Sequence, residues 1–105
     1  MREKLIFRRK ESHEDVSMIE REVVVRNRAG IHARPAALIV QTASQFSSHI
    51  EFKNSHDTIN AKSIMGIITL GAGYNSTITI SAEGEDAAEA VDRLAQLFEN
   101  RFEEE

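Results

Sequence analysis

A histidine, an arginine and the single proline of the chain lie close together in the segment Gly30-Ile31-His32-Ala33-Arg34-Pro35. Pro35 suits the first turn of a helix, because the N–H that it lacks would have no partner there. His32 would then lie near the N-cap, beside N–H groups without an intrahelical partner. Those donors and the positive end of the helix dipole form a site for an anion, above all a phosphate. Arg34 adds a guanidinium whose geometry suits phosphate oxygens.

The residue types around His32 favour group transfer over hydrolysis. The helix dipole disfavours a second proton on the imidazole, so His32 is predicted to act as a nucleophile that forms a labile N–P bond. The loop carries no acid that could serve as a base for water. We therefore expect a phosphoryl group to be accepted, held and passed on. The spacing alone leaves a second interpretation open, in which His32 is a polar helix-cap residue without chemistry.

The composition restricts the class of protein. A chain of 105 residues, 41% of them hydrophobic, is enough for one small domain with a modest core. The absence of cysteine excludes disulfides and thiolate chemistry, and the net charge of −4 argues against a nucleic-acid partner. No apolar run approaches the roughly 20 residues that span a bilayer, and the start lacks the apolar stretch of a signal peptide. We expect a cytoplasmic protein without a membrane partner.

Hydrophobic periodicity predicts the elements that position His32. Alternating side chains predict strands over residues 19–26, 49–53, 58–61 and 76–82. Apolar residues at intervals of three and four predict helices over residues 35–46, 63–70 and 87–102. The order strand, helix, strand, strand, helix, strand, helix predicts an α+β open-faced β-sandwich. In it, a four-stranded, mainly antiparallel sheet is covered on one face by three helices.

The same patterns predict which side chains face the core. On the strands they are Val23, Val25, Ile50, Phe52, Ile78, Ile80 and Ala82. On the first helix they are Ala36, Ala37, Val40, Ala43 and Ser44, with Leu38 and Ile39 widening the apolar face. On the second they are Ile64, Ile67 and Ile68, and on the third they are Ala87, Val91, Leu94, Ala95, Phe98 and Phe102.

The two ends of the chain differ from its centre in hydrophobic periodicity and in charge. Residues 1–18 show neither period, so we expect a flexible or loosely attached extension before a domain of residues 19–105. One hypothesis is that translation starts at Met18 and that the preceding residues are an artefact of start-site assignment. Short charge runs, among them the acidic Glu103 to Glu105, are interpreted as solvated ends.

Other candidate sites have weaker patterns. His13, His49 and His56 lie on the extension, on a strand and in a turn, without the spacing of metal ligands, so we interpret them as surface histidines and expect no metal site. Gly71-Ala72-Gly73 lacks the lysine of a phosphate-binding loop and is better explained as the end of a helix.

Two motifs carry a resemblance to a known family. Residues 30–36, Gly-Ile-His-Ala-Arg-Pro-Ala, resemble the active-site signature of HPr, the histidine-containing phosphocarrier of the phosphoenolpyruvate-dependent phosphotransferase system. Residues 60–66, Asn-Ala-Lys-Ser-Ile-Met-Gly, followed by Leu70-Gly71, resemble the regulatory serine segment of that family. The resemblance covers residues 19–102.

The resemblance implies a role for the first motif. His32 would accept a phosphoryl group from phospho-enzyme I on Nδ1 and donate it to IIA domains of enzyme II. Arg34 would stabilise the phosphoryl group. The protein would then be a carrier without a cofactor and not an enzyme. A monomer is expected, because it presents one face to many partners.

The resemblance implies regulation at the second motif. Ser63 would be phosphorylated by an HPr kinase/phosphorylase that uses ATP, and Ile64 and Met65 would form part of an apolar docking patch. From the residues alone Ser63 is a helix cap, and both roles can hold together. Without the resemblance Met65 would be a core residue.

Three alternatives compete with a sugar-uptake phosphocarrier. The first is a mainly regulatory, nitrogen-type member of the same family, and the sequence does not separate the two. The second is a relative that binds partners without carrying phosphate, which the presence of His32 disfavours. The third is a kinase-like enzyme, for which no nucleotide-binding element is present in the sequence.

Overall fold

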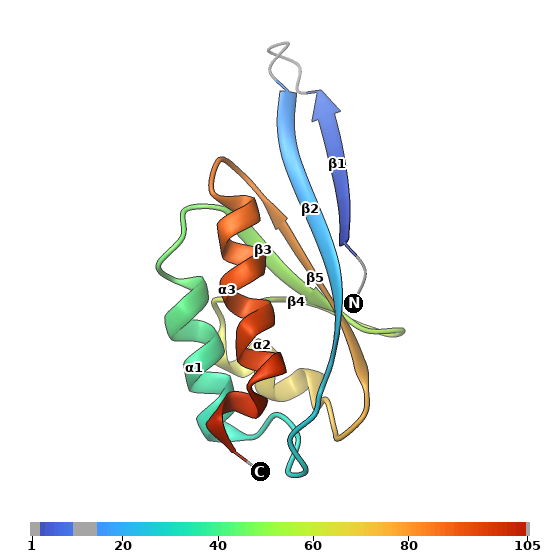
Figure 1. Ribbon diagram of the computed structural model, residues 1–105, viewed down its shortest axis with the longest axis vertical. Coiled ribbons are helices and arrows are strands. Elements are labelled where there is room, and N and C mark those ends of the chain that lie inside the picture. The colour runs from blue at the N-terminus through green and yellow to red at the C-terminus, as the bar shows by residue number, and fades with distance from the viewer. Residues whose placement is uncertain (1–2, 10–14, 105) are drawn as a thin grey trace.

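The computed structural model describes residues 3–9 and 15–104, and in it three helices lie on one face of an antiparallel sheet (Figure 1). The strands are β1 (Glu3–Arg9), β2 (Asp15–Val24), β3 (His49–Lys53), β4 (Thr58–Asn60) and β5 (Thr77–Glu83). The helices are α1 (Ala33–Ala43), α2 (Ile64–Leu70) and α3 (Ala87–Glu99), followed by the 3₁₀ turn η1 (Arg101–Glu103). No helix in this part of the chain is long and apolar enough to cross a bilayer.

The strand order is β1-β2-β5-β3-β4, and every neighbouring pair is antiparallel. Strands β2 to β5 are the four strands predicted from the sequence, and α1 to α3 are the three predicted helices. The open-faced α+β sandwich is therefore confirmed. Its topology brings the N-terminus of α1 and the C-terminal turn after α3 to the same end of the molecule (Figure 1).

Strand β1 is an addition that the sequence patterns did not predict. It pairs with β2 in a register that runs from Glu3 opposite Arg21 to Arg9 opposite Asp15. Residues 3–9 and 15–18 of the expected extension therefore belong to strands, because ladder hydrogen bonds join backbone groups and do not require a clear side-chain period. The remaining residues of the extension, His13 included, lie outside the described part. The hypothesis of a start at Met18 stays a prediction.

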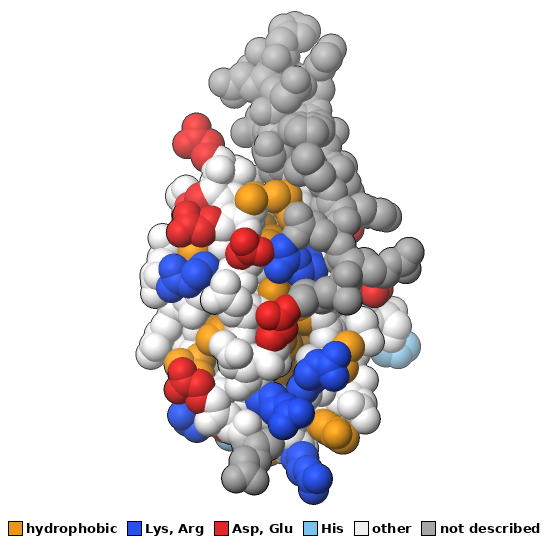
Figure 2. All heavy atoms as spheres, viewed as in Figure 1, with side chains coloured by type: hydrophobic (Ala, Val, Ile, Leu, Met, Phe, Trp, Pro, Cys, Tyr) orange, Lys and Arg blue, Asp and Glu red, His pale blue; other side chains and the backbone are white. Residues whose placement is uncertain are grey.

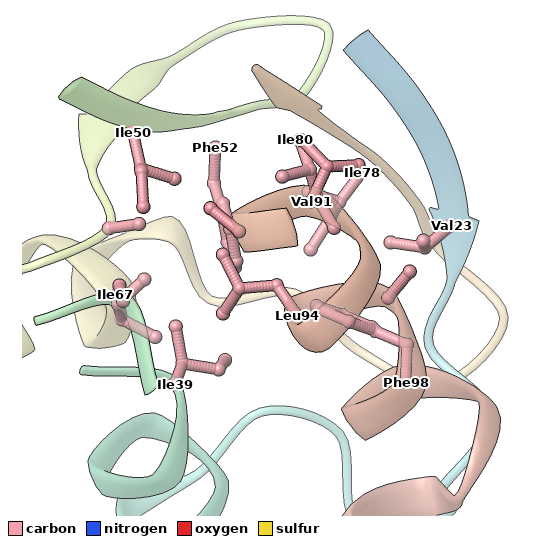
Figure 3. Packing of buried hydrophobic residues seen from close by; sticks show 14 of the residues in the cluster. Val23, Ile39, Ile50, Phe52, Ile67, Ile78, Ile80, Val91, Leu94 and Phe98 are labelled. Atoms are coloured by element: carbon pink, nitrogen blue, oxygen red, sulfur yellow. The ribbon is translucent and has the colours of Figure 1, made fainter. Parts of the chain in front are cut away.

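The core lies between the sheet and the helices (Figure 3). All seven strand residues predicted to face inward are buried, and so are the six residues predicted for the third helix. The predicted range of 87–102 was too long, because α3 ends at Glu99 and Phe102 lies in η1. Phe98 packs against two other aromatic rings, with its ring centroid 5.8 Å from that of Phe52 and 4.9 Å from that of Phe102. Because β-strand side chains alternate between two faces, one inward residue fixes the facing of the others along each strand.

Helix α2 departs from the prediction. Of its three isoleucines only Ile67 is buried, whereas Ile64 and Ile68 are 43% and 44% exposed. A helix of seven residues has room for one narrow buried stripe, which Ile67 and Leu70 occupy. The other apolar side chains of α2 are left on the surface.

Candidate functional site

The loop before α1 is held against the segment that follows α2. The Ile31 N–H donates to the carbonyl oxygen of Ala72 at 2.9 Å. Gly30 has a φ of +74°, and a Cβ at this position would lie 2.9 Å from the same oxygen. Only glycine combines this backbone conformation with so close an approach. The loop therefore delivers His32 to the start of α1 in a fixed position.

His32 is the N-cap residue of α1, as predicted. Its backbone is extended, and its carbonyl oxygen accepts the first helical hydrogen bond, from the Ala36 N–H at 2.9 Å. Its side chain makes no capping hydrogen bond and is 43% exposed. The imidazole therefore does not itself cap the helix, and the interpretation of His32 as a polar residue without chemistry stays a prediction.

The first turn of α1 is open to an anion. Ala33 and Arg34 occupy the first two helical positions, where backbone N–H groups have no partner within the helix, and Pro35 has no N–H. This turn contains no acidic residue. The Arg34 side chain is 59% exposed beside His32. The predicted combination of helix mouth, imidazole and guanidinium is therefore present in the structure.

Glu104 is a site residue that sequence reasoning missed. Its carboxylate lies against His32, with Oε2 and Oε1 at 3.1 and 3.2 Å from Nε2, and Oε2 is 3.6 Å from a guanidinium nitrogen of Arg34. The side chain is only 16% exposed, so the interpretation of the acidic end as solvated is wrong for this residue. The observation that no acid lies in the loop itself holds, but folding supplies one from the end of the chain.

The pKa of Glu104 is lowered by its surroundings. Desolvation is the largest single influence and raises it, but the other influences together outweigh it. They are hydrogen bonds from Asn27 and His32 and the charges of His32 and Arg34. The carboxylate is therefore ionised at neutral pH.

Asn27 links Glu104 to the loop. It is fully buried, and its side-chain amide group donates to the Gly30 carbonyl at 2.7 Å and to Glu104 Oε1 at 3.1 Å. Both partners are acceptors, which fixes the orientation of the amide. A sequence pattern gives no sign of this contact, because 77 positions separate Asn27 from Glu104.

Ser63 is the N-cap residue of α2, and its Oγ accepts a hydrogen bond from the Gly66 N–H at 3.1 Å. The helix-cap role predicted from the residues alone is present. Beyond it, Ile64 and Met65 are exposed, Met65 by 66%, so the interpretation of Met65 as a core residue is wrong. Ile68 and Tyr74 are also exposed, and we call Ile64, Met65, Ile68 and Tyr74 the apolar patch.

Tyr74 of the apolar patch and several basic side chains lie near the loop that carries His32. Tyr74 directly follows Gly73, whose Cα is 3.0 Å from the position that a Cβ of Gly30 would take. In Figure 2, Lys and Arg side chains gather toward the end of the molecule where the loop before α1 and the C-terminus lie in Figure 1. The exposed arginines of these two segments are Arg26, Arg28, Arg34 and Arg101.

The other described histidines lie away from this site. His49 contacts Glu51 on β3 at 2.9 Å, and His56 lies in the exposed turn between β3 and β4. Within residues 3–9 and 15–104, no three acidic or histidine side chains gather in an arrangement that could hold a metal ion.

Known proteins resemble this chain in sequence and in fold. A family profile described as "PTS HPr component phosphorylation site" matches residues 19–100. A curated relative, phosphocarrier protein HPr of Treponema pallidum, is 49% identical over 84% of this chain and all of its own length. The chain belongs to the HPr family of the phosphotransferase system.

Solved structures agree with this assignment. A crystal structure of HPr from Thermoanaerobacter tengcongensis matches with a TM-score of 0.79 and 49% identity, over 82% of this chain and 97% of that one. The Bacillus subtilis catabolite-repression protein Crh matches with a TM-score of 0.64 and 40% identity, over 75% of this chain and 91% of that one. In that crystal structure Crh is a dimer with a swapped domain.

Proposed function

We propose that this protein accepts a phosphoryl group from phospho-enzyme I on Nδ1 of His32 and passes it to IIA domains of enzyme II. The observation that carries the proposal is an N-cap imidazole that makes no capping bond and lies partly exposed at the mouth of α1. Membership of the HPr family supports it. The protein would act as a cytoplasmic carrier without a cofactor and not as an enzyme.

The transfer requires one bond to form and one to break. The Nδ1 lone pair of neutral His32 attacks the phosphorus of the donor's phosphohistidine, and the donor's N–P bond breaks with its electron pair returning to the donor ring. The His32 ring becomes a phosphoimidazolium, and the donor ring becomes neutral imidazole. No proton has to change places. The unpartnered N–H groups of the first turn and the Arg34 guanidinium would stabilise the phosphoryl oxygens.

The surface around His32 suits an acidic partner with an apolar centre. Tyr74 of the apolar patch lies near the loop that carries His32, and Arg26, Arg28, Arg34 and Arg101 are exposed on this loop, on α1 and after α3. Apolar contacts would supply affinity, and charge complementarity would raise the association rate. We propose that enzyme I and the IIA domains bind this surface in turn, with Ile64 and Met65 at its centre, and that a monomer of residues 19–105 suffices.

We further propose that Ser63 is a regulatory phosphorylation site for an HPr kinase/phosphorylase that uses ATP. A phosphoryl group there would add about −2 of charge at the start of α2 and directly before Ile64. The helix dipole favours negative charge at this position, so that the fold would be kept. The charge would repel an acidic partner.

Ser63→Asp is expected to slow phosphorylation of His32 by about an order of magnitude, since it places a fixed negative charge beside the apolar patch. The melting temperature should change by less than about 2 °C, because aspartate caps a helix about as well as serine. Rates of transfer from phospho-enzyme I and thermal unfolding curves measure the two effects. Ser55→Asp, in an exposed turn, makes the same charge change and is the control. A transfer rate equal to that of the unmodified protein would refute the prediction.

The alternative is a mainly regulatory, nitrogen-type role within the same phosphotransferase chemistry. The likeness to Crh, whose name refers to catabolite repression, supports the regulatory part of this alternative and not its nitrogen-type part. Transfer assays with IIA domains of sugar-specific and nitrogen-type systems separate the two roles, because only the preferred acceptors would be phosphorylated rapidly.

Incubation with enzyme I and labelled phosphoenolpyruvate tests the main proposal. The label should be labile in acid and stable in base, as a phosphohistidine is, and mass spectrometry should place it on His32. Label that survives acid would indicate a phosphoester and would contradict the proposal.

A further inference from the structure

We propose that this chain forms a two-fold symmetric dimer in which β1 of one copy pairs, antiparallel, with β1 of a second copy. The pairing is centred on Ile6, and it joins the five-stranded sheets of the two copies into one continuous sheet. The inference concerns residues 3–9 and does not rest on the function proposed above.

Strand β1 has one edge without a strand partner. It lies at the end of the strand order, and within the described residues β2 is the only strand that pairs with it (Figure 1). Its seven residues contain neither proline nor glycine, and its register to β2 runs without a bulge. Those are common devices that prevent a further strand from pairing with an edge. The backbone N–H and C=O groups that point away from β2 are therefore available to another strand.

The pairing with β2 presents this edge before any second copy binds. Three pairs of the register join residue types of opposite charge, which stabilises an antiparallel ladder. These pairs are Glu3–Arg21, Lys4–Glu20 and Arg9–Asp15. A preformed edge strand does not have to be ordered when it associates, and this lowers the entropic cost of binding.

The sequence of β1 is complementary to itself. Residues paired across a two-fold axis perpendicular to the sheet lie on the same face, and all seven residues overlap when Ile6 lies on that axis. Leu5 of each copy is then opposite Phe7 of the other, and Glu3 is opposite Arg9 at both ends. Moving the register by two residues in either direction would pair Glu3 with Phe7 or Leu5 with Arg9. The centred register therefore matches apolar with apolar residues and acid with base.

One pair in this register is unfavourable. Lys4 of each copy would lie opposite Arg8 of the other, and like charges at directly opposite positions are destabilising. The register of β2 places Glu20 on the other side of Lys4, so that the row of charges alternates in sign at this point. Seven residues on each side also form only a small interface. We therefore expect a weak dimer whose population depends on concentration.

The opposite edge of the sheet does not offer a comparable strand. β4 has three residues, whereas β1 has seven, so β1 gains more ladder hydrogen bonds from a second β1. A symmetric pairing of this kind uses the same surface on both copies and is closed after two. β1 runs toward the end of the molecule opposite the loop before α1 (Figure 1), so His32 would stay exposed in both copies.

Cysteine cross-linking tests the register. The chain has no cysteine, so one introduced thiol reports on a single position. Under mild oxidation with copper phenanthroline, Ile6→Cys should form a covalent dimer, because Cα atoms paired across two strands lie about 4.5 to 5.5 Å apart, within the range of a disulfide. In the control Lys4→Cys the two thiols would be about 13 Å apart along the strands, so that cross-linking should be about tenfold slower. Equal rates for the two variants, or no cross-link in Ile6→Cys, would overturn the proposal.

Exchange of charge between copies tests the pairing of Glu3 with Arg9. In sedimentation equilibrium, the average mass of the unmodified protein should rise from 11.8 kDa at about 10 µM toward twice that value at about 500 µM. Glu3→Arg alone and Arg9→Glu alone should each lower the dimer fraction at least about threefold, because each places like charges at both ends of the interface. An equimolar mixture of the two variants should restore it, because every changed residue then meets its opposite. Glu85→Arg, in an exposed turn, makes the same charge change and should dimerise like the unmodified protein.

Three outcomes would contradict the proposal. The first is a protein that stays monomeric at about 500 µM. The second is a mixture that is no more dimeric than either variant by itself, which is expected if the copies exchange β1 onto each other's β2, where Glu3 and Arg9 meet Arg21 and Asp15. The third is an average mass that rises beyond twice 11.8 kDa, because a two-fold interface closes after two copies.

Discussion

His32→Ala is expected to abolish phosphoryl uptake from phospho-enzyme I, with a residual rate below about 1% of that of the unmodified protein. The reason is that the reaction needs a nitrogen lone pair, and no other described side chain offers one at the mouth of α1. The Arg34 guanidinium only donates hydrogen bonds and offers no lone pair that could attack phosphorus. Labelled phosphoenolpyruvate, enzyme I and an acid-lability assay give the measurement.

A matched control is His49→Ala, which removes a histidine that is 60% exposed on β3 and pairs with Glu51. This variant should accept phosphate at an unchanged rate. Both variants should melt within a few degrees of the unmodified protein, because neither imidazole is buried. Acid-labile label that persists in His32→Ala, or disappears in His49→Ala, would show that the phosphoryl group is carried elsewhere.

Asp86→Ala is expected to destabilise the protein more than most other single substitutions outside the core. The Asp86 carboxylate, at the start of α3, accepts hydrogen bonds from the backbone N–H and the hydroxyl of both Ser47 and Ser48. It thereby fastens the segment between α1 and β3 to α3. Ser48 is only 2% exposed, so loss of the acceptor would leave its buried polar groups without a partner. The melting temperature should fall by more than about 5 °C.

The same carboxylate makes stability depend on pH. Hydrogen bonds from the Ser48 hydroxyl first, and then from the Ser47 backbone, lower the pKa of Asp86 from 3.8 to about 2. A depressed pKa in the folded state means that the contribution of Asp86 is complete above pH 3.8 and is lost as the pH falls toward 2. In urea unfolding experiments, the free energy of unfolding of the unmodified protein should fall between pH 6 and pH 2. In Asp86→Ala this fall should be smaller, because the contribution of Asp86 is already missing.

Asp57→Ala, in an exposed turn, is the control for this loss and should leave both the melting temperature and the pH profile unchanged. If Asp86→Ala and the unmodified protein lost stability in parallel over the whole acid range, Asp86 would not be the group responsible.

Local patterns were sufficient for most of the fold. The alternation in β3 and β5 and the apolar stripe of α3 depend only on which face each side chain occupies, and that facing follows from backbone geometry. The start of α1 was also predictable, because Pro35 has few positions open to it in a helix. Sequence patterns did not predict which face of α2 is buried, because several of its faces are apolar. They also did not predict β1, which pairs with β2 through backbone hydrogen bonds.

The sequence by itself determined the grouping of His32, Arg34 and Pro35, since they are close along the chain and a helix start brings them together without help from other elements. Only the tertiary structure decided what surrounds that group. Glu104 is 72 positions from His32 in the sequence. It contacts the imidazole because α3 ends near the start of α1 and because a left-handed turn, with the Phe102 side chain buried in the core, follows α3. No periodic pattern records such a contact, because it depends on the packing of elements and not on the geometry of any one of them.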